Sequence, residues 1–185
     1  MSTVLVVNAG SSSLKLSLLD GSDRLLERTQ LPANAFGVDR LALRDVFRIW
    51  PVPDVVGHRI VHGGTDFRSS VRITPAVEKR LRELVDLAPL HQPKSLAALA
   101  AVRAHLPEVD EIACFDTAFH ATIGEAAATY AVPREWRTRW GLRRYGFHGL
   151  SHAYCKRHAA RLAGHVDSGG LRIVTCHLGA GASLA

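Results

Sequence analysis

The clearest candidate for anion binding is a polar loop close to the N-terminus. The stretch Asn-Ala-Gly-Ser-Ser-Ser at residues 8–13 is followed by Lys15. Glycine allows close approach to the backbone, the serines offer hydroxyl and amide donors, and the lysine adds positive charge. This loop can therefore cradle a phosphate, although it lacks the G-x-x-x-x-G-K-[ST] spacing of a P-loop. A serine-rich hairpin turn explains the same residues equally well.

Two charged residues lie in or directly after strongly apolar segments. Arg59 stands beside Ile60 and Val61, and Asp116 follows the apolar residues 112–115. The arginine is either a planar fork for a carboxylate or phosphate, or an edge-strand side chain that reaches solvent. The aspartate either caps the following turn or orients a metal-bound phosphate. The residues alone leave both pairs of alternatives open.

Glycine and histidine patterns suggest two further kinds of site, and we disfavour both. The run Gly179-Ala180-Gly181 lacks the third glycine and the helix of a dinucleotide-binding fingerprint. Ten histidines include two pairs spaced by four residues, His58/His62 and His148/His152. Without an H-E-x-x-H motif, a zinc cage is disfavoured. We expect most of these histidines to be hydrogen-bonded structural residues.

Composition indicates a globular protein of the cytoplasm. Of 185 residues, 47% are hydrophobic and 22% are charged, which is ordinary for a soluble domain. No apolar run approaches the ~20 residues of a membrane span. The first residues lack a secretory signal, and three widely spaced cysteines suit reduced thiols. We therefore expect neither membrane association nor a disulfide framework.

The net charge of +6 has its densest source in residues 134–145, where arginines alternate with aromatic residues. Such a pattern can stack and neutralise single-stranded nucleic acid. A solvated helix and loop with aromatic anchors explains it better, so nucleic-acid binding is disfavoured.

Hydrophobic periodicity predicts a strand meander followed by alternating helices and strands, which is an α/β fold. The expected strands are residues 4–7, 14–19, 24–31, 54–61, 111–115 and 171–176. The expected helices are residues 38–49, 75–88, 95–106 and 151–162. Polar loops at 8–13 and 179–183 follow strands, where such sheets bind ligands.

Seven stretches, in order, resemble the motifs of the acetokinase family of acetate and propionate kinases. They are residues 8–15, 57–64, 87–93, 115–120, 144–149, 151–152 and 177–179. The resemblance implies the ribonuclease-H-like α/β fold of the acetate and sugar kinase/actin superfamily. It implies an N-terminal acetokinase domain at residues 1–120 and the start of a second, truncated domain at residues 121–185. Because family members are longer, we expect strand 171–176 to present an unpaired edge and the chain alone to be poorly soluble.

The family activity implied by the resemblance is reversible, Mg²⁺- or Mn²⁺-dependent phosphoryl transfer from ATP to acetate, giving acetyl phosphate and ADP. Alternatives are a propionate kinase or an inactive binding remnant, and the family implies a homodimer. The implied catalytic residues are Asp116, His148 and Arg59. Those implied for the carboxylate substrate are Arg59, Val61, Leu90, His91 and Phe147. Those implied for ATP are Ser11, Ser13, Lys15, His177, Leu178, Gly179, Ala180 and Gly181, with Asn8 near the metal.

The chemistry of this activity limits what the site must do. A carboxylate acceptor is already ionised at neutral pH, so no general base is required and Asp116 is expected to position Mg²⁺. The chain departs from the family pattern at three residues, Ala180 and Gln92 (asparagine is usual at both) and Leu150 (threonine is usual). The segment between Lys15 and Arg59 is also shorter than in many relatives.

Overall fold

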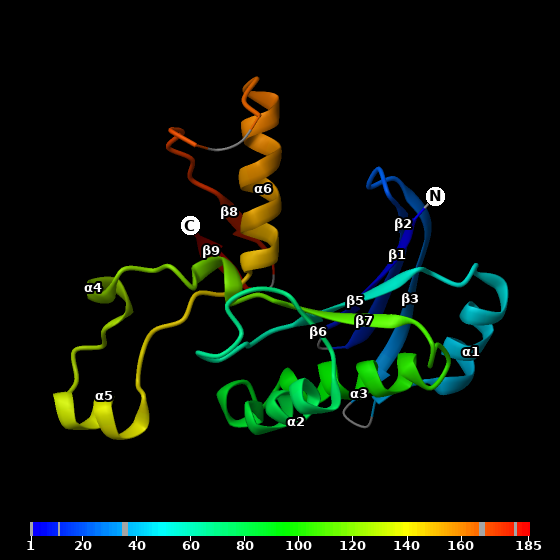
Figure 1. The fold of residues 1–185 in the computed structure, drawn as a ribbon, viewed down its shortest axis with the longest axis horizontal. Coiled ribbons are helices and arrows are strands. Elements are labelled where there is room, and N and C mark those ends of the chain that lie inside the picture. Colours follow the sequence, from blue (N-terminus) through cyan, green and yellow to red (C-terminus); the bar gives the residue numbers. More distant parts are fainter. Residues whose placement is uncertain (1, 11, 35–36, 167–168, 180) are drawn as a thin grey trace.

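The computed structural model describes residues 2–10, 12–34, 37–166, 169–179 and 181–185. Its centre is a seven-stranded mixed sheet of order β4-β3-β2-β1-β5-β7-β6 (Figure 1). The strands are β1 (Thr3–Ala9), β2 (Ser13–Asp20), β3 (Leu25–Asn34), β4 (Gly37–Val38), β5 (Val55–Ile60), β6 (Val71–Arg72) and β7 (Asp110–Phe115). The first three form the expected antiparallel meander, and β1, β5 and β7 run parallel to one another.

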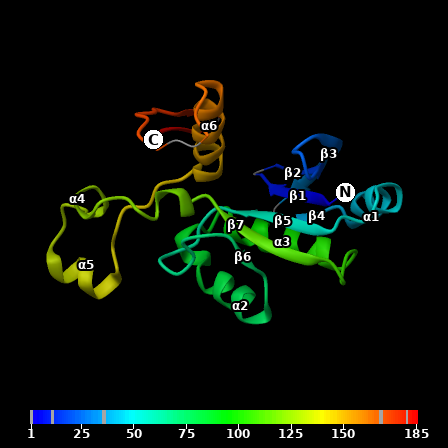
Figure 2. The ribbon, with the colours of Figure 1, turned by 45° about the horizontal axis from the view of Figure 1, so that its top comes forward.

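Helices cover this sheet unequally on its two sides. They are α1 (Arg40–Ile49), α2 (Pro75–Glu83), α3 (Gln92–Arg103), α4 (Glu125–Ala128), α5 (Arg134–Trp140) and α6 (Gly149–Leu162). Helices α2 and α3 lie against one side, whereas α6 rises from the other (Figures 1 and 2). The main core forms where the inward faces of β1 and β2 meet α3, through residues such as Leu5, Leu16 and Leu99. Among the described residues, no helix has the length and apolar content to cross a bilayer.

Local sequence explains where the helices begin. The Asp39 carboxylate accepts hydrogen bonds from the first backbone amides of α1, so this helix starts after the predicted residue 38. Thr74 caps α2 as expected, and a proline occupies its first turn. The predicted helix 95–106 begins earlier, at Gln92, because Pro93 is tolerated in a first turn.

The predicted strand at residues 171–176 is wrong for most of its length. Regular pairing starts at β8 (Cys176–Leu178), which forms a two-stranded sheet with β9 (Ala182–Leu184). Thr175 exchanges backbone hydrogen bonds with Ala185, but residues 171–174 have no ladder partner among the described residues. An apolar sequence becomes a strand only where a neighbour supplies hydrogen bonds.

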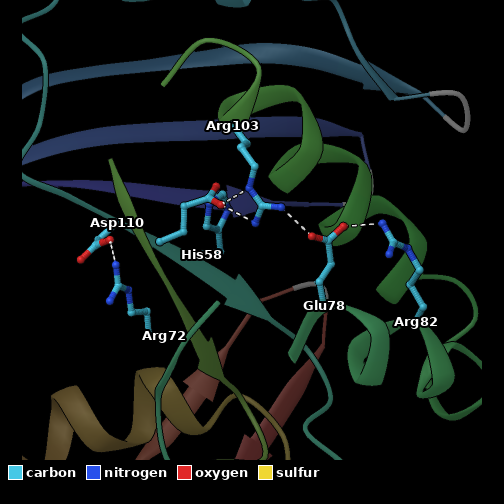
Figure 3. Close-up of polar contacts among 7 residues, drawn as sticks. His58, Arg72, Glu78, Arg82, Arg103 and Asp110 are labelled. Carbon is cyan, nitrogen blue, oxygen red and sulfur yellow. Dashed lines mark hydrogen bonds and ion pairs between the residues drawn. The ribbon is translucent and has the colours of Figure 1, made fainter. Parts of the chain in front are cut away.

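A partly buried polar network ties the sheet to α2 and α3 (Figure 3). The Glu111 carboxylate on β7 contacts His58 Nε2 at 2.9 Å and Arg103 Nε at 2.5 Å. Arg103 also donates to Glu78, and this hydrogen bond lowers the pKa of the Glu78 carboxyl. His58 is fully buried and directly precedes Arg59, so the network fixes β5 at the residue before the candidate anion ligand.

Candidate functional site

Three polar side chains meet at the ends of adjacent parallel strands. Asn8 lies near the end of β1, Arg59 near the end of β5, and Asp116 directly after β7. The carboxyl ends of parallel strands share one sheet edge, which is where open α/β sheets bind ligands. Because β5 lies between β1 and β7, Arg59 is on an interior strand, and the edge-strand alternative is wrong.

The Arg59 guanidinium is the centre of this group. Its Nη2 and Nε atoms donate to Asp116 Oδ2 at 2.6 and 3.1 Å, and its Nη1 donates to Asn8 Oδ1 at 3.1 Å. Asp116 is 2% exposed, whereas the Arg59 side chain is 28% exposed. The aspartate therefore holds the guanidinium in place while part of it remains open to a ligand.

Arg59 and Asp116 line a cavity of about 340 Å³. The remaining lining residues are Val61, Leu87, Ala88, His91, Phe147 and His148. Six of these eight residues are among those implied by the family resemblance. Leu90 is not among them: its side chain is 76% exposed, and Leu87 and Ala88 line the cavity instead.

His148 occupies an unusual backbone position at the start of α6. Its φ of 56° is in the left-handed region, which a non-glycine residue seldom adopts. The next residue, Gly149, donates its backbone N–H to Asp116 O at 3.0 Å, and a Cβ atom there would lie 2.1 Å from the same oxygen. Glycine is thus required for α6 to start against Asp116, and this close approach places His148 beside the cavity.

Hydroxyl groups hold the histidines around His148. Ser183 Oγ lies 2.9 Å from His148 Nδ1 and 2.8 Å from His152 Nε2. The His177 ring stacks on His148 with centroids 4.1 Å apart, and Ser151 Oγ lies 2.9 Å from His177 Nδ1. Neither Ser151 nor Ser183 is among the site residues that the resemblance implied. Their position beside histidine-containing motifs was the only available signal.

The two candidate phosphate loops are described in part. Ser13 is buried and its carbonyl oxygen accepts from Gly10 N at 2.8 Å, while Lys15 is exposed and pairs with Asn8 in the β1–β2 ladder. In the second loop, Leu178 and Gly179 are exposed, and a Cβ on Gly181 would lie 3.4 Å from His148 Cε1. Ser11 and Ala180 lie outside the described residues.

Gln92 has a structural position that the sequence did not reveal. Its side chain is fully buried, and Nε2 donates to the His62 carbonyl at 3.2 Å. His62 in turn packs edge-on against Tyr145 and Phe147, with ring centroids 4.5 and 5.5 Å away. Gln92 therefore supports the residues behind the cavity wall.

The buried histidines predict a pH-dependent stability. Burial lowers the pKa of His62, His148 and His152, and neighbouring histidines lower the last two further. In the unfolded chain a histidine titrates near pH 6.5. The unfolded state therefore binds protons at a higher pH than the folded state. The contribution of these histidines to the free energy of unfolding is therefore fully present above about pH 6.5. It is lost as the pH falls through their lowered pKa values in the folded state.

We expect the melting temperature to be lower at pH 5.5 than at pH 7.5, measured by circular dichroism. His152→Gln should weaken this dependence, whereas His158→Gln, at an exposed position of the same helix, should not. An equal melting temperature at both pH values would contradict the interpretation.

The chain is similar in sequence to known acetate kinases. The profile of the Acetokinase family matches residues 39–185. An acetate kinase of Geobacillus sp. (strain WCH70) is 39% identical over 215 aligned positions, covering all of this chain and 54% of the relative. One of Nostoc punctiforme is 54% identical over 132 positions, covering 71% of this chain and 32% of the relative.

Solved structures give the same result. An acetate kinase of Porphyromonas gingivalis superposes with a TM-score of 0.85 at 34% identity, and a propionate kinase of Francisella tularensis with 0.86 at 30%. Each covers all of this chain and 54% of the solved chain. The chain thus spans about half the length of these relatives, and its α/β fold is theirs. Together, the matched profile and the identity along the whole chain show that this chain belongs to the acetokinase family.

Proposed function

We propose that this chain forms the carboxylate-binding half of an acetate kinase, which transfers phosphate reversibly between ATP and acetate. The observation that carries the proposal is the cavity at the ends of β5 and β7, whose lining is divided between polar groups, the Arg59 guanidinium among them, and apolar side chains. Acetate has the same division, with a carboxylate and a methyl group. Family membership supports the choice of reaction.

In this proposal Arg59 binds the acetate carboxylate, while Val61 and Phe147 surround the methyl group. An acetate oxygen attacks the γ-phosphorus of ATP, the bond from that phosphorus to the bridging oxygen breaks, and ADP leaves with the bonding electron pair. The acceptor is already an anion, so no side chain has to remove a proton. The barrier is the repulsion between two anions, which the positive charges of Arg59 and Lys15 offset. The His148 imidazole, whose lowered pKa keeps it neutral near pH 7, can donate a hydrogen bond to the phosphoryl group.

The residues present fit a magnesium ion. Asn8 Oδ1 and the Asp116 carboxylate offer oxygen ligands at one sheet edge, and both accept hydrogen bonds from the Arg59 guanidinium, at 3.1 and 2.6 Å. Mg²⁺ typically takes one or two protein oxygens and completes its shell with water and phosphate. We propose that Asn8 and Asp116 hold the ion, which would neutralise charge on the phosphate oxygens. Ser13, Lys15 and the loop from His177 to Gly181 would contact the phosphates of ATP.

Family membership also leads us to propose that the protein is a homodimer and lies in the cytoplasm. Within each chain we propose an acetokinase domain that ends near residue 120 and a second domain that begins after it. The described cysteines are free thiols, which suits a reducing compartment. We favour acetate over propionate as the substrate because most of the relatives named above are acetate kinases. The preference is weak in energy, since one methylene changes binding by about 1–3 kcal/mol.

Saturation-transfer NMR with acetate tests binding on the chain itself. Saturation of the protein should transfer to the acetate methyl protons, and Arg59→Ala should remove most of the signal. Arg72→Ala is the matched control, because Arg72 pairs with Asp110 at the far end of β7. A signal that survives Arg59→Ala unchanged would contradict the assignment of the carboxylate site.

A further inference from the structure

Residues 121–147 form an arm that carries α4 and α5 away from the sheet (Figures 1 and 2). Two adjoining cavities are lined partly by this arm. Their volumes are about 150 and 320 Å³, and Arg68, Ala121 and Arg143 line both. Arg137 lines the larger one. Neither shares a lining residue with the cavity around Arg59, so they form a separate place on the molecule. We call them together the arginine cavity.

The three guanidiniums of the arginine cavity lack acidic partners. No carboxylate of the described residues forms an ion pair with Arg68, Arg137 or Arg143. Arg68 Nη2 donates to the Ala121 carbonyl at 2.6 Å, and the Arg143 guanidinium lies 5.3 Å from the centre of the Tyr145 ring. Three positive charges therefore border these adjoining cavities without a direct ion pair to a described carboxylate.

One hydrogen-bond donor among the arginines of the cavity is unsatisfied by the described residues. The Nε atom of Arg137 is buried and has no hydrogen-bond partner among the described residues. Buried polar groups in native proteins are nearly always hydrogen-bonded, so this donor is left for an acceptor that the described residues do not supply. Guanidinium groups match the oxygen geometry of phosphate and carboxylate groups.

We propose that the arginine cavity binds a phosphate group. Among the described lining residues Glu125 is the one carboxylate, and with three arginines it leaves a net charge of about +2. A phosphate dianion matches this charge better than a monocarboxylate. The site goes beyond the proposed transfer reaction and does not depend on it, because it uses none of the residues of the Arg59 cavity.

Tryptophan fluorescence provides a direct test. Trp136 flanks Arg137 in sequence and packs against Trp140 with ring centroids 5.6 Å apart, so both report on this helix. The 185-residue chain would be titrated with inorganic phosphate at constant ionic strength. A parallel titration with glycerol 2-phosphate separates the two sources: tighter binding of the ester identifies a phosphorylated metabolite, and equal binding identifies free phosphate.

We expect saturable phosphate binding that Arg137→Gln weakens about tenfold or more, because a charge-assisted hydrogen bond is lost. Arg68→Gln, at an exposed position, gives a second variant that should weaken binding without affecting folding. Arg134→Gln is the matched control on the same helix, outside both linings. Arg59→Ala should leave this binding unchanged.

Two results would overturn the proposal. One is the absence of saturable binding by a chain whose cooperative melting shows it to be folded. The other is binding that Arg59→Ala removes while Arg137→Gln and Arg68→Gln leave it intact, which would place the phosphate in the carboxylate cavity.

Discussion

Replacing Arg59 with alanine is expected to lower kcat/KM for acetate by about 10²–10³-fold, the cost of removing a charged group that stabilises the transition state. Arg59 is the guanidinium that faces the 340 Å³ cavity, and Asp116 fixes its orientation. The assay is acyl-phosphate formation, trapped with hydroxylamine. It requires a complete nucleotide site, so the chain would replace the matching 54% of the Geobacillus enzyme.

Arg72→Ala is the control for this experiment, because Arg72 is a comparably charged residue on β6 with an exposed ion pair. Such pairs contribute about 0–1 kcal/mol. Arg59→Lys keeps the charge but loses the planar fork, and should recover little activity. Full activity in Arg59→Ala would show that another group binds the carboxylate.

Asp116→Asn is expected to damage both stability and activity. Removing one partner of a buried ion pair costs about 3–5 kcal/mol, and the lower end applies here because Arg59 keeps some contact with solvent. Activity should fall by at least about 10²-fold, since the amide neither holds a metal ion nor orients the guanidinium equally well. Chemical denaturation and the hydroxylamine assay measure the two effects separately.

Asp110→Asn provides the matched control, since Asp110 lies at the other end of β7 and its side chain is half exposed. Its stability should change by no more than about 1 kcal/mol. If Asp116→Asn behaved like Asp110→Asn in both assays, Asp116 would be a turn cap and not part of the site.

The fold was predictable where a local pattern of apolar and turn residues coincided with the pairing of strands in the structure. The meander of β1, β2 and β3 has alternating apolar residues and turn residues between strands, and both signals are local. Residues 171–174 carry the same apolar character but find no strand neighbour among the described residues. Helix α4 was missed because it has only four residues, too few to show a helical period. Helix α5 lies within the solvated helix and loop expected at residues 134–145.

The site was predictable in its charged members and less so in its apolar walls. Arg59 stands out because it interrupts an apolar strand, and Asp116 because it directly follows one. Their mutual contact became evident only from the parallel pairing of β5 with β7. Leu87 and Ala88 line the cavity through a 3-10 turn (Val85–Leu87) and the residue after it, a local geometry that replaces the expected Leu90.

The hydrogen bonds of the histidines also needed the structure. His148 and His152 are four residues apart, a spacing that invites a metal interpretation. They instead share the Ser183 hydroxyl, which is more than thirty residues away in the sequence. A partner at that separation produces no local pattern.

The most direct measurement is the hydroxylamine-trapped acyl phosphate formed from ATP, Mg²⁺ and acetate by the graft of this chain onto the Geobacillus enzyme. We expect acetohydroxamate to accumulate in proportion to enzyme, to require each of the three reactants, and to form about 10²–10³-fold more slowly in Arg59→Ala. A folded graft that still transfers saturation to acetate but forms no hydroxamate would contradict the account, because the chain would then be a binding remnant without catalysis.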